Sequence, residues 1–258
     1  MAPTGLACFD FDWSLIDTDS DRFVIEYLSP VLRHKLDTSP MQWTDLQNEC
    51  LKEYYDQGGS GQKIRESLTN IPLDSKMIQA CQLLHSKGWV LAIVSDANQV
   101  YIEGILEHYG IKNLFSAIIT NPAFWDVQDR LHIQRLIPAD GTPHGCLTGG
   151  CSLNICKGQE VDKLLLNLNG GTTGSTVIAS FDKAAAPLRM LYVGDGRNDY
   201  CPALRMNSSE DIYFVRKGRS LEKYLNKADA PEIRKAIHSR IVYWDKAGEI
   251  LSELQSAL

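Results

Sequence analysis

The sequence lacks any long apolar run and any cluster of lysine and arginine. None of its apolar stretches approaches the roughly 20 residues that a membrane-spanning helix needs, so we expect no membrane partner. Its net charge is −6, and binding to nucleic-acid phosphates needs clustered cations, so we expect no nucleic-acid partner. The N-terminus has neither the basic nor the apolar part of a secretion signal, which favours a cytoplasmic location.

The chain also lacks Cys-x2-Cys pairs, which are typical of zinc fingers, although it contains 7 cysteines. Without a secretion signal these cysteines are better interpreted as reduced thiols than as disulfides. A glycine-rich segment nevertheless holds four sulfur and nitrogen ligands: His144, Cys146, Cys151 and Cys156. Two interpretations stay open, a structural zinc site and thiols that behave as small apolar residues.

Short apolar runs alternate with segments of helical period along the chain. Runs rich in Val, Ile, Leu and aromatic residues predict buried strands at 6–11, 89–95, 116–120, 189–193 and 211–215. Because such strands alternate with helical patterns, we expect an α/β fold with a Rossmann-like doubly wound parallel sheet.

About seventy residues separate the first two predicted strands, which is too long for a simple crossover connection. Their helical patterns cover residues 20–35, 43–57, 60–69 and 74–87. We therefore predict an all-helical cap over residues 17–87, inserted into a catalytic core of residues 1–16 and 88–258. A hairpin beside the sheet is predicted within 121–137, and the Gly/Ser/Thr-rich residues 169–187 predict a mobile surface loop.

Acidic side chains follow two of the predicted strands. Asp10 and Asp12 come directly after the first strand, and Asp195 and Asp199 lie in a glycine-containing turn after the strand at 189–193. Carboxylates this close raise each other's pKa unless a cation or a proton relieves them. Mg²⁺ prefers such oxygen ligands, so we expect these four residues to form a magnesium site, with Asp12 contributing its carboxylate or its backbone carbonyl, although either turn alone could be a solvated loop.

Ser95, Asp96 and Lys157 also fall where strands end or helices begin. A serine before a helix can donate to a phosphate oxygen or simply cap the helix. A lysine can offset crowded acids and the charge of a phosphoryl group. Because ligands of open α/β sheets bind at the carboxyl ends of the strands, we expect these residues at one site.

This ordered set of motifs resembles the haloacid dehalogenase (HAD) superfamily of phosphohydrolases with an aspartate nucleophile. The resemblance implies that Asp10 attacks phosphorus and that Asp12 acts as acid and then base. It further implies that Ser14, Ser95 and Lys157 bind the phosphoryl group, and that Mg²⁺ is the cofactor. Ser14 stands where threonine is commoner in that superfamily, but it keeps the hydroxyl group.

A closer resemblance is to the eukaryotic phosphatases that act on phosphoethanolamine, phosphocholine or pyridoxal phosphate. It implies that Asp21 and Asp96 face the head group of the substrate, where carboxylates would attract an ammonium ion. Asp21 could equally be an acid in the first turn of a helix. Pyridoxal phosphate would instead favour aromatic stacking, for which Trp13, Tyr54 or Trp125 are candidates.

The expected function is thus hydrolysis of a small, amine-bearing phosphate ester through an aspartyl-phosphate. In two alternatives the protein is still an enzyme: a phosphatase for pyridoxal phosphate or another vitamin monophosphate, or a pyrophosphatase. A third is a phospho-accepting receiver domain, which would need a long-lived aspartyl-phosphate. Asp12 argues against the receiver, because an acid two residues beyond the nucleophile serves to hydrolyse that intermediate. The oligomeric state stays open.

Overall fold

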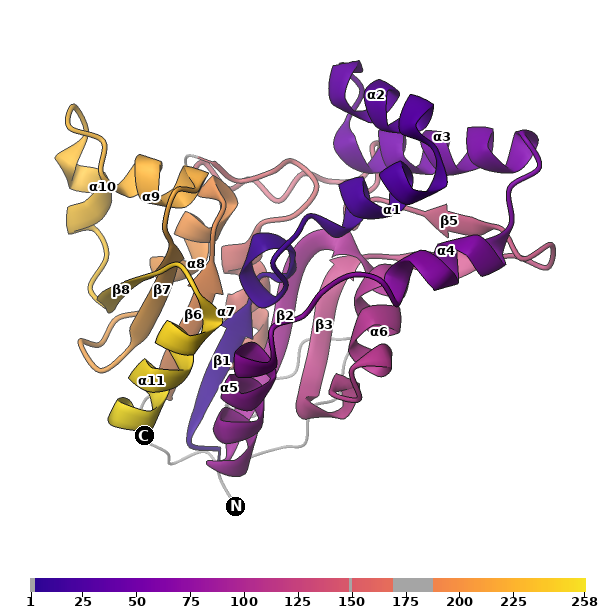
Figure 1. Cartoon of the computed structure of the whole chain (residues 1–258). Helices are drawn as coiled ribbons and strands as arrows, with labels where there is room; N and C mark the ends of the chain where they lie inside the picture. The colour runs from indigo at the N-terminus through magenta and orange to yellow at the C-terminus, as the bar shows by residue number, and fades with distance from the viewer. Residues whose placement is uncertain (1–2, 149, 169–187) are drawn as a thin grey trace.

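The computed structural model describes residues 3–148, 150–168 and 188–258. The predicted loop at 169–187 lies outside the described residues. Six parallel strands form the main sheet: β1 (Gly5–Phe9), β2 (Trp89–Asn98), β3 (Phe115–Asn121), β6 (Arg189–Gly194), β7 (Ile212–Arg216) and β8 (Arg240–Trp244). Their order is β3-β2-β1-β6-β7-β8, which places β1 between β2 and β6 (Figure 1). All five predicted strands are present, and β8 is an additional edge strand.

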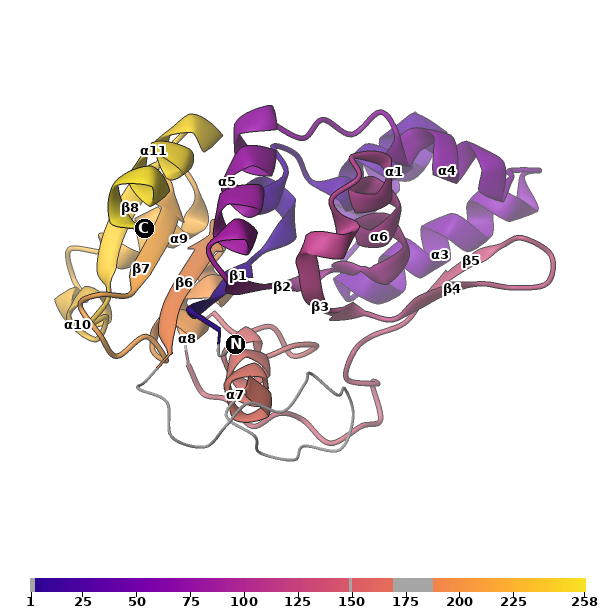
Figure 2. The same cartoon turned by 90° about the horizontal axis from the view of Figure 1, so that it is seen from below.

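Helices cover both faces of the sheet because side chains alternate along each strand. Ala7 and Phe9 of β1 belong to a core shared with α5 (Ser75–Ser86), α6 (Gln99–His108) and α11 (Ala247–Ala257). Leu6 and Cys8 belong to a second core, shared with α7 (Lys157–Leu168), α8 (Tyr200–Ala203) and α9 (Ser220–Leu225). Figure 2 shows α5 and α11 on one side of the sheet and α7 on the other. The predicted doubly wound α/β fold is confirmed.

Four helices between β1 and β2 form a group that lies away from the sheet, at the upper right of Figure 1. They are α1 (Ser20–Leu28), α2 (Pro30–Thr38), α3 (Trp43–Asp56) and α4 (Gly61–Leu68). The helix predicted over 20–35 is two helices, because Ser29 caps α2 and Pro30 occupies its first position. α5 falls within the predicted cap range but packs against β2 and α11. The division into cap and core stays a prediction.

The hairpin predicted within 121–137 consists of β4 (Ala123–Trp125) and β5 (Leu131–Ile133). It joins the helical group instead of lying beside the sheet. The Leu131 amide donates to the Tyr55 hydroxyl at 2.8 Å, and Arg65 of α4 pairs with Asp129 at 2.5 Å.

A short helix, α10 (Pro231–Lys235), precedes β8. None of the helices in the described parts of the chain has the length and apolar character needed to cross a bilayer.

Candidate active site

Asp10 lies at the carboxyl end of the central strand β1. Its amide donates to the carbonyl of Val193 at 2.9 Å, which extends the pairing of β1 with β6 by one residue. From β1 the chain continues to β2 on one side and returns to β6 on the other side. Such a reversal of strand order opens a crevice beyond the strand ends, where open α/β sheets bind their ligands. Asp10 is therefore at the topological switch point, and it is only 4% exposed.

The structure brings three of the predicted acids and the predicted lysine together. One carboxylate oxygen from each of Asp10, Asp195 and Asp199 lies within 4.8 Å of the others. The Lys157 ammonium is fully buried, and its Nζ lies 2.8 Å from Oδ1 of Asp10 and 2.8 Å from Oδ1 of Asp199. Lys157 begins α7, so the helix carries this cation to the end of the sheet.

Asp199 is held rigidly by its neighbours. The Tyr192 hydroxyl donates to its Oδ1 at 2.9 Å, and the amides of Asp195 and Gly196 donate to its Oδ2 at 3.1 and 2.9 Å. A side chain at Gly194 would place its Cβ 2.6 Å from the Cβ of Asp199, which explains a glycine there. The turn after β6 is thus built around this carboxylate.

Negative charge in this cluster exceeds the positive charge supplied by Lys157. Burial raises the pKa of Asp10 well above its ordinary value, and the Asp199 charge raises it further, although Lys157 opposes both effects. Burial and the Asp199 charge also raise the pKa of Asp195, to about 7. A divalent cation bound by oxygen ligands would relieve this repulsion, so the donor set fits Mg²⁺.

The Asp12 carboxylate lies in a different group. A single π-helical turn, η1 (Phe11–Leu15), follows Asp10, and within it Asp12 keeps extended backbone angles. Its Oδ1 accepts from the Ser20 amide at 2.9 Å, and its carboxylate lies within 4.8 Å of those of Asp19 and Asp21. Burial, followed by the charge of Asp21, raises its pKa well above the ordinary value. The structure therefore places the Asp12 side chain among the acids of α1 and not with Asp10, Asp195 and Asp199.

Trp13 adopts the left-handed backbone conformation, with φ of 57°, which is rare for a bulky residue. Its carbonyl accepts from Nη1 of Arg216 at 2.9 Å. The Arg219 guanidinium stacks on its indole ring, 3.5 Å from the ring centroid. Strain of this kind persists only where the surroundings enforce it, and it gathers at functional sites.

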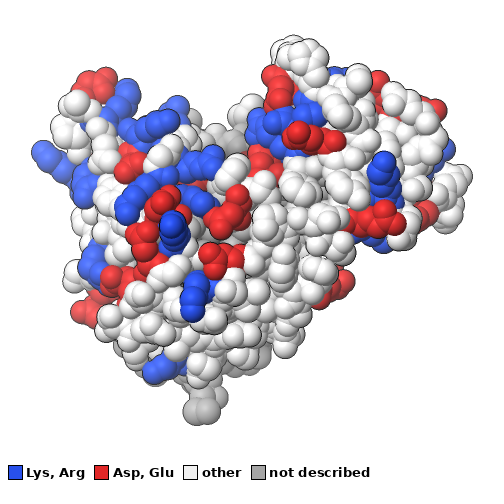
Figure 3. Space-filling view, in the orientation of Figure 1, with Lys and Arg blue, Asp and Glu red and all other residues white. Residues whose placement is uncertain are grey.

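A cavity of about 260 Å³ joins the two acidic groups. Its walls are formed by Asp10, Asp12, Trp13, Asp19, Asp21, Arg22, Trp43, Asp96, Asp195 and Asn198. The molecule is hollowed between the part that carries α1–α4 and the part that carries α9 and α10, and charged side chains of both signs gather there (Figure 3).

Both acids predicted to face the head group line this cavity. Oδ2 of Asp21 accepts from the Trp43 indole at 2.9 Å and from the Gln47 amide at 2.5 Å, whereas its buried Oδ1 has no hydrogen-bond partner among the described residues. Asp96 accepts from the Asn198 side chain at 3.2 Å. Burial and the charge of Asp19 raise the pKa of Asp21 to about 8.

The two predicted phosphate-binding serines are buried and do not line the cavity. The Ser95 hydroxyl accepts from the Ala97 amide at 3.2 Å, and the Ser14 hydroxyl has no hydrogen-bond partner within the described parts of the chain. Of the three predicted aromatic candidates only Trp13 lines the cavity. Trp125 lies elsewhere, stacked against Arg65, and Tyr54 lines a separate cavity.

Sequence reasoning missed several residues of the cavity wall. Asp19 and Asn198 lie next to predicted site residues in the sequence, so the acidic run at 17–21 and the turn at 194–199 could have indicated them. Arg22 directly follows the predicted Asp21 on α1, whereas Trp43 reaches the cavity only through the packing of α3 against α1, and no local pattern marks it.

Nearly the whole chain is similar in sequence to known phosphatases. A family model described as "Putative Phosphatase" matches residues 5–258. The chain is 36% identical over 210 residues to "Inorganic pyrophosphatase 1" of Arabidopsis thaliana, covering 81% of this chain and 65% of that protein. It is 35% identical over 254 residues to the "Thiamine phosphate phosphatase-like protein" of the same plant, covering 97% and 95%. With "Pyridoxal phosphate phosphatase PHOSPHO2" of Rattus norvegicus it shares 29% identity, covering 97% of each.

Solved structures of similar fold include a phosphoserine phosphatase described as a phospho-aspartyl intermediate analogue. It matches with a TM-score of 0.54 at 11% identity and covers 99% of both chains. A HAD family hydrolase from Salmonella enterica matches with a TM-score of 0.59 at 14% identity, covering 100% of this chain and 73% of that one. At such low identity these likenesses show the fold alone.

Proposed function

The chain belongs to the "Putative Phosphatase" family and is a phosphatase of the HAD superfamily, and we propose that it uses Mg²⁺ to hydrolyse a small, amine-bearing phosphate monoester. The proposal includes an aspartyl-phosphate on Asp10. It is supported by the buried cluster of Asp10, Asp195, Asp199 and Lys157 at the switch point of the sheet. Bound at this cluster, Mg²⁺ would neutralise charge on the transferring phosphoryl group.

Asp10 has one carboxylate oxygen suited to attack. Its Oδ1 accepts from the Phe11 amide at 2.8 Å and contacts Lys157 at 2.8 Å. We therefore assign the attack on phosphorus to Oδ2. In the first step a bond forms between this oxygen and phosphorus while the bond to the ester oxygen breaks. In the second step water attacks phosphorus, and the bond to Asp10 breaks to release phosphate.

In this proposal Asp12 first donates a proton to the leaving group and later accepts a proton from water. Burial and the charge of Asp21 raise the pKa of this carboxyl group, which favours the protonated form that can pass its proton to the departing ester oxygen. The resulting carboxylate then takes a proton from the attacking water. Lys157, Ser14 and Ser95 are assigned to the phosphoryl oxygens, and Asp195 and Asp199 to the metal.

The acidic wall of the cavity supports a cationic substrate. Asp12, Asp19 and Asp21 lie together, and of these three only Asp19 is paired with an arginine among the described residues, with Arg22 at 2.5 Å. The free Oδ1 of Asp21 is a buried acceptor, and such a group costs stability unless a donor reaches it. An ammonium head group would supply both the charge and the donor, and the cavity of about 260 Å³ limits it to a small one.

A second candidate is a vitamin monophosphate whose ring carries positive charge. The indoles of Trp13 and Trp43 line the same cavity as the acids, and aromatic faces bind flat or cationic groups. This candidate agrees with the printed names of two relatives, which refer to thiamine phosphate and pyridoxal phosphate. Pyrophosphate, the substrate in the name of another relative, offers no cation to the acidic wall.

A substrate panel tests the proposal. Phosphocholine, phosphoethanolamine, thiamine monophosphate, pyridoxal phosphate, pyrophosphate and p-nitrophenyl phosphate are assayed with Mg²⁺ and with EDTA. We expect a cationic ester to have a kcat/KM at least about tenfold above p-nitrophenyl phosphate. If pyrophosphate ranks first, the assignment of a cationic head group is wrong, and if EDTA leaves activity unchanged, the assignment of the metal is wrong.

A further inference from the structure

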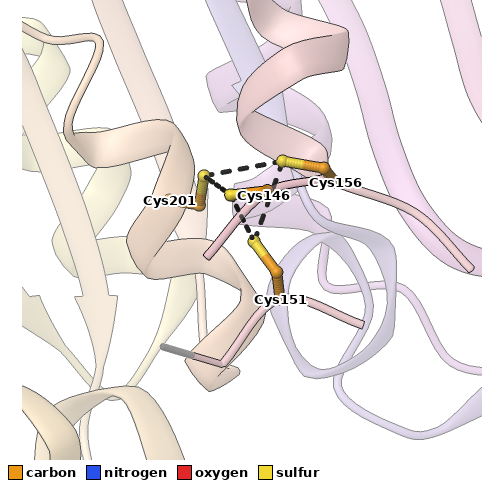
Figure 4. Close-up of side chains that lie close together, drawn as sticks. All are labelled: Cys146, Cys151, Cys156 and Cys201. Carbon is orange, nitrogen blue, oxygen red and sulfur yellow. Dashed lines mark hydrogen bonds between the residues drawn. The ribbon is translucent and has the colours of Figure 1, made fainter. Parts of the chain in front are cut away.

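Four cysteines that the proposed reaction does not use lie close together (Figure 4). They are Cys146, Cys151, Cys156 and Cys201, and their sulfur atoms all lie within 4.8 Å of one another. The Sγ–Sγ distances are 3.5 Å for Cys146–Cys151, 3.6 Å for Cys156–Cys201, and 3.7 Å for both Cys146–Cys201 and Cys151–Cys156. The sulfur atoms therefore surround a common centre.

These distances match the edges of a metal-centred tetrahedron. With Zn–S bonds of about 2.3 Å, regular tetrahedral geometry separates the sulfur atoms by about 3.8 Å. A disulfide would instead bring two of them to about 2.05 Å. We propose that Cys146, Cys151, Cys156 and Cys201 bind one structural Zn²⁺ ion, a second metal site distinct from that of the proposed reaction.

Hydrogen-bond donors around the cluster suit four thiolates bound to one divalent ion, a unit with a net charge of about −2. Nη1 of Arg205 lies 3.3 Å from Sγ of Cys201 and also donates to the Cys201 carbonyl at 3.1 Å. Asp162 holds the same guanidinium at 3.1 Å. The backbone of Gln159 hydrogen-bonds to the Cys156 sulfur, and that of Thr148 to the Cys146 sulfur. Such outer contacts orient metal ligands and offset their charge.

The ligand set differs from the one that the sequence suggested. His144 cannot be the fourth ligand in this arrangement, because its Nε2 lies 2.7 Å from the Ser152 carbonyl and its Nδ1 accepts from the Cys146 amide at 3.0 Å. Both ring nitrogens are thus occupied by the backbone. Cys201 takes the fourth position, 45 residues beyond Cys156 in the sequence.

The ion would fasten a segment that has little other support. The described residues between β5 and α7 contain no helix or strand, and three of the cysteines lie there. The fourth, Cys201, is on α8. Cys156 directly precedes Lys157, and Cys201 follows Asp199 by two residues, so the zinc would join the two backbone segments whose side chains form the 2.8 Å ion pair. It would position these residues without touching substrate.

Metal analysis of the purified, untagged protein tests this proposal. We expect about one zinc ion per chain by mass spectrometry of the native protein, retained after dialysis that removes Mg²⁺. Cys151→Ser and Cys201→Ser should each lose most of the zinc. Cys81→Ala is the matched control, because Cys81 is a buried thiol on α5, outside this cluster, and should keep it.

Cobalt substitution keeps the test independent of how the variants fold. Wild-type protein prepared with Co²⁺ should show the thiolate-to-cobalt charge-transfer bands and the strong visible bands of a tetrahedral sulfur site. Asp10→Asn protein should show the same bands, which separates this proposal from the proposed reaction. The proposal is overturned if wild-type protein incubated with Zn²⁺ binds none, if the four thiols are found as disulfides, or if Cys201→Ser retains full zinc.

Discussion

Nζ of Lys157 lies 2.8 Å from Oδ1 of Asp10, and neither side chain has appreciable contact with solvent. The same ammonium lies 2.8 Å from Asp199, so one buried cation compensates two buried acids. Burial alone would lower the pKa of Lys157, but the charges of Asp10 and Asp199 outweigh it and raise the pKa above its ordinary value. Lysine at this position is therefore both part of the proposed phosphate site and a condition for burying the acids.

Replacing Lys157 by methionine should destabilise the fold as well as abolish activity. Removing one partner of a buried ion pair leaves charge uncompensated, which costs about 3–5 kcal/mol of unfolding free energy. Urea unfolding, measured without Mg²⁺, gives this quantity. Lys163→Met is the control on the same helix, because Lys163 is exposed and its one ion pair among the described residues is with Glu160. It should change stability by less than about 0.5 kcal/mol. Equal stability of the two variants would contradict the structural role.

Replacing Asp10 by asparagine should remove turnover and keep the fold. The amide has nearly the same shape, and its oxygen can still accept from the Phe11 amide and from Lys157. It cannot attack phosphorus, so we expect kcat to fall by more than about a thousandfold. Circular dichroism and the melting temperature check the fold, and hydrolysis of p-nitrophenyl phosphate checks turnover. Activity above about one per cent of wild type would remove Asp10 from the role of nucleophile.

The sequence predicted the interior strands because strands buried on both faces read as continuous apolar runs. β3, at one edge of the sheet, was predicted as well, whereas β8, at the other edge, escaped prediction because only Trp244 of its residues is buried. The split between α1 and α2 was missed although Ser29 and Pro30 mark it, because the apolar period continues across them.

The positions of Asp10 and Asp195 were predictable because each follows a strand directly, and parallel strands end at one edge. The direction of the Asp12 side chain was not, since it depends on the extended backbone angles that Asp12 keeps within the π-helical turn and on the Ser20 amide that donates to its Oδ1. The sequence also did not indicate that Cys201 is a partner of the cysteines in the glycine-rich segment. Its sulfur meets the others only because α7 and α8 pack together on the same face of the sheet.

Magnesium binding should strengthen as the pH rises toward 7. The pKa of Asp195 is raised to about 7 by burial and by Asp199, so below that pH the ion must displace a proton. The affinity should therefore rise up to about tenfold per pH unit below pH 7 and level off above it. Calorimetry in two buffers of different ionisation enthalpy measures both the affinity and the protons released. In Asp195→Asn binding should weaken and fewer protons should be released, because Asp195 no longer contributes one. An affinity that is constant from about pH 6 to 8 would contradict the assignment of Asp195 as a ligand.

Asp21 should distinguish cationic substrates from neutral ones. Its pKa is raised to about 8 by burial and by Asp19, so the empty cavity holds it largely protonated near pH 7. A bound ammonium group favours the ionised form and gains an ion pair from it. Asp21→Asn keeps an acceptor for Trp43 and Gln47 but cannot form that pair.

For Asp21→Asn we therefore expect kcat/KM to fall at least about tenfold for the best amine-bearing ester and less than about threefold for p-nitrophenyl phosphate. Asp96→Asn should likewise lower kcat/KM more for the amine-bearing ester than for p-nitrophenyl phosphate. Asp56→Asn, at an exposed acid near the end of α3, should change neither. Equal losses on both substrates would mean that Asp21 supports only the local structure, because a structural defect does not distinguish a charged head group from a neutral one.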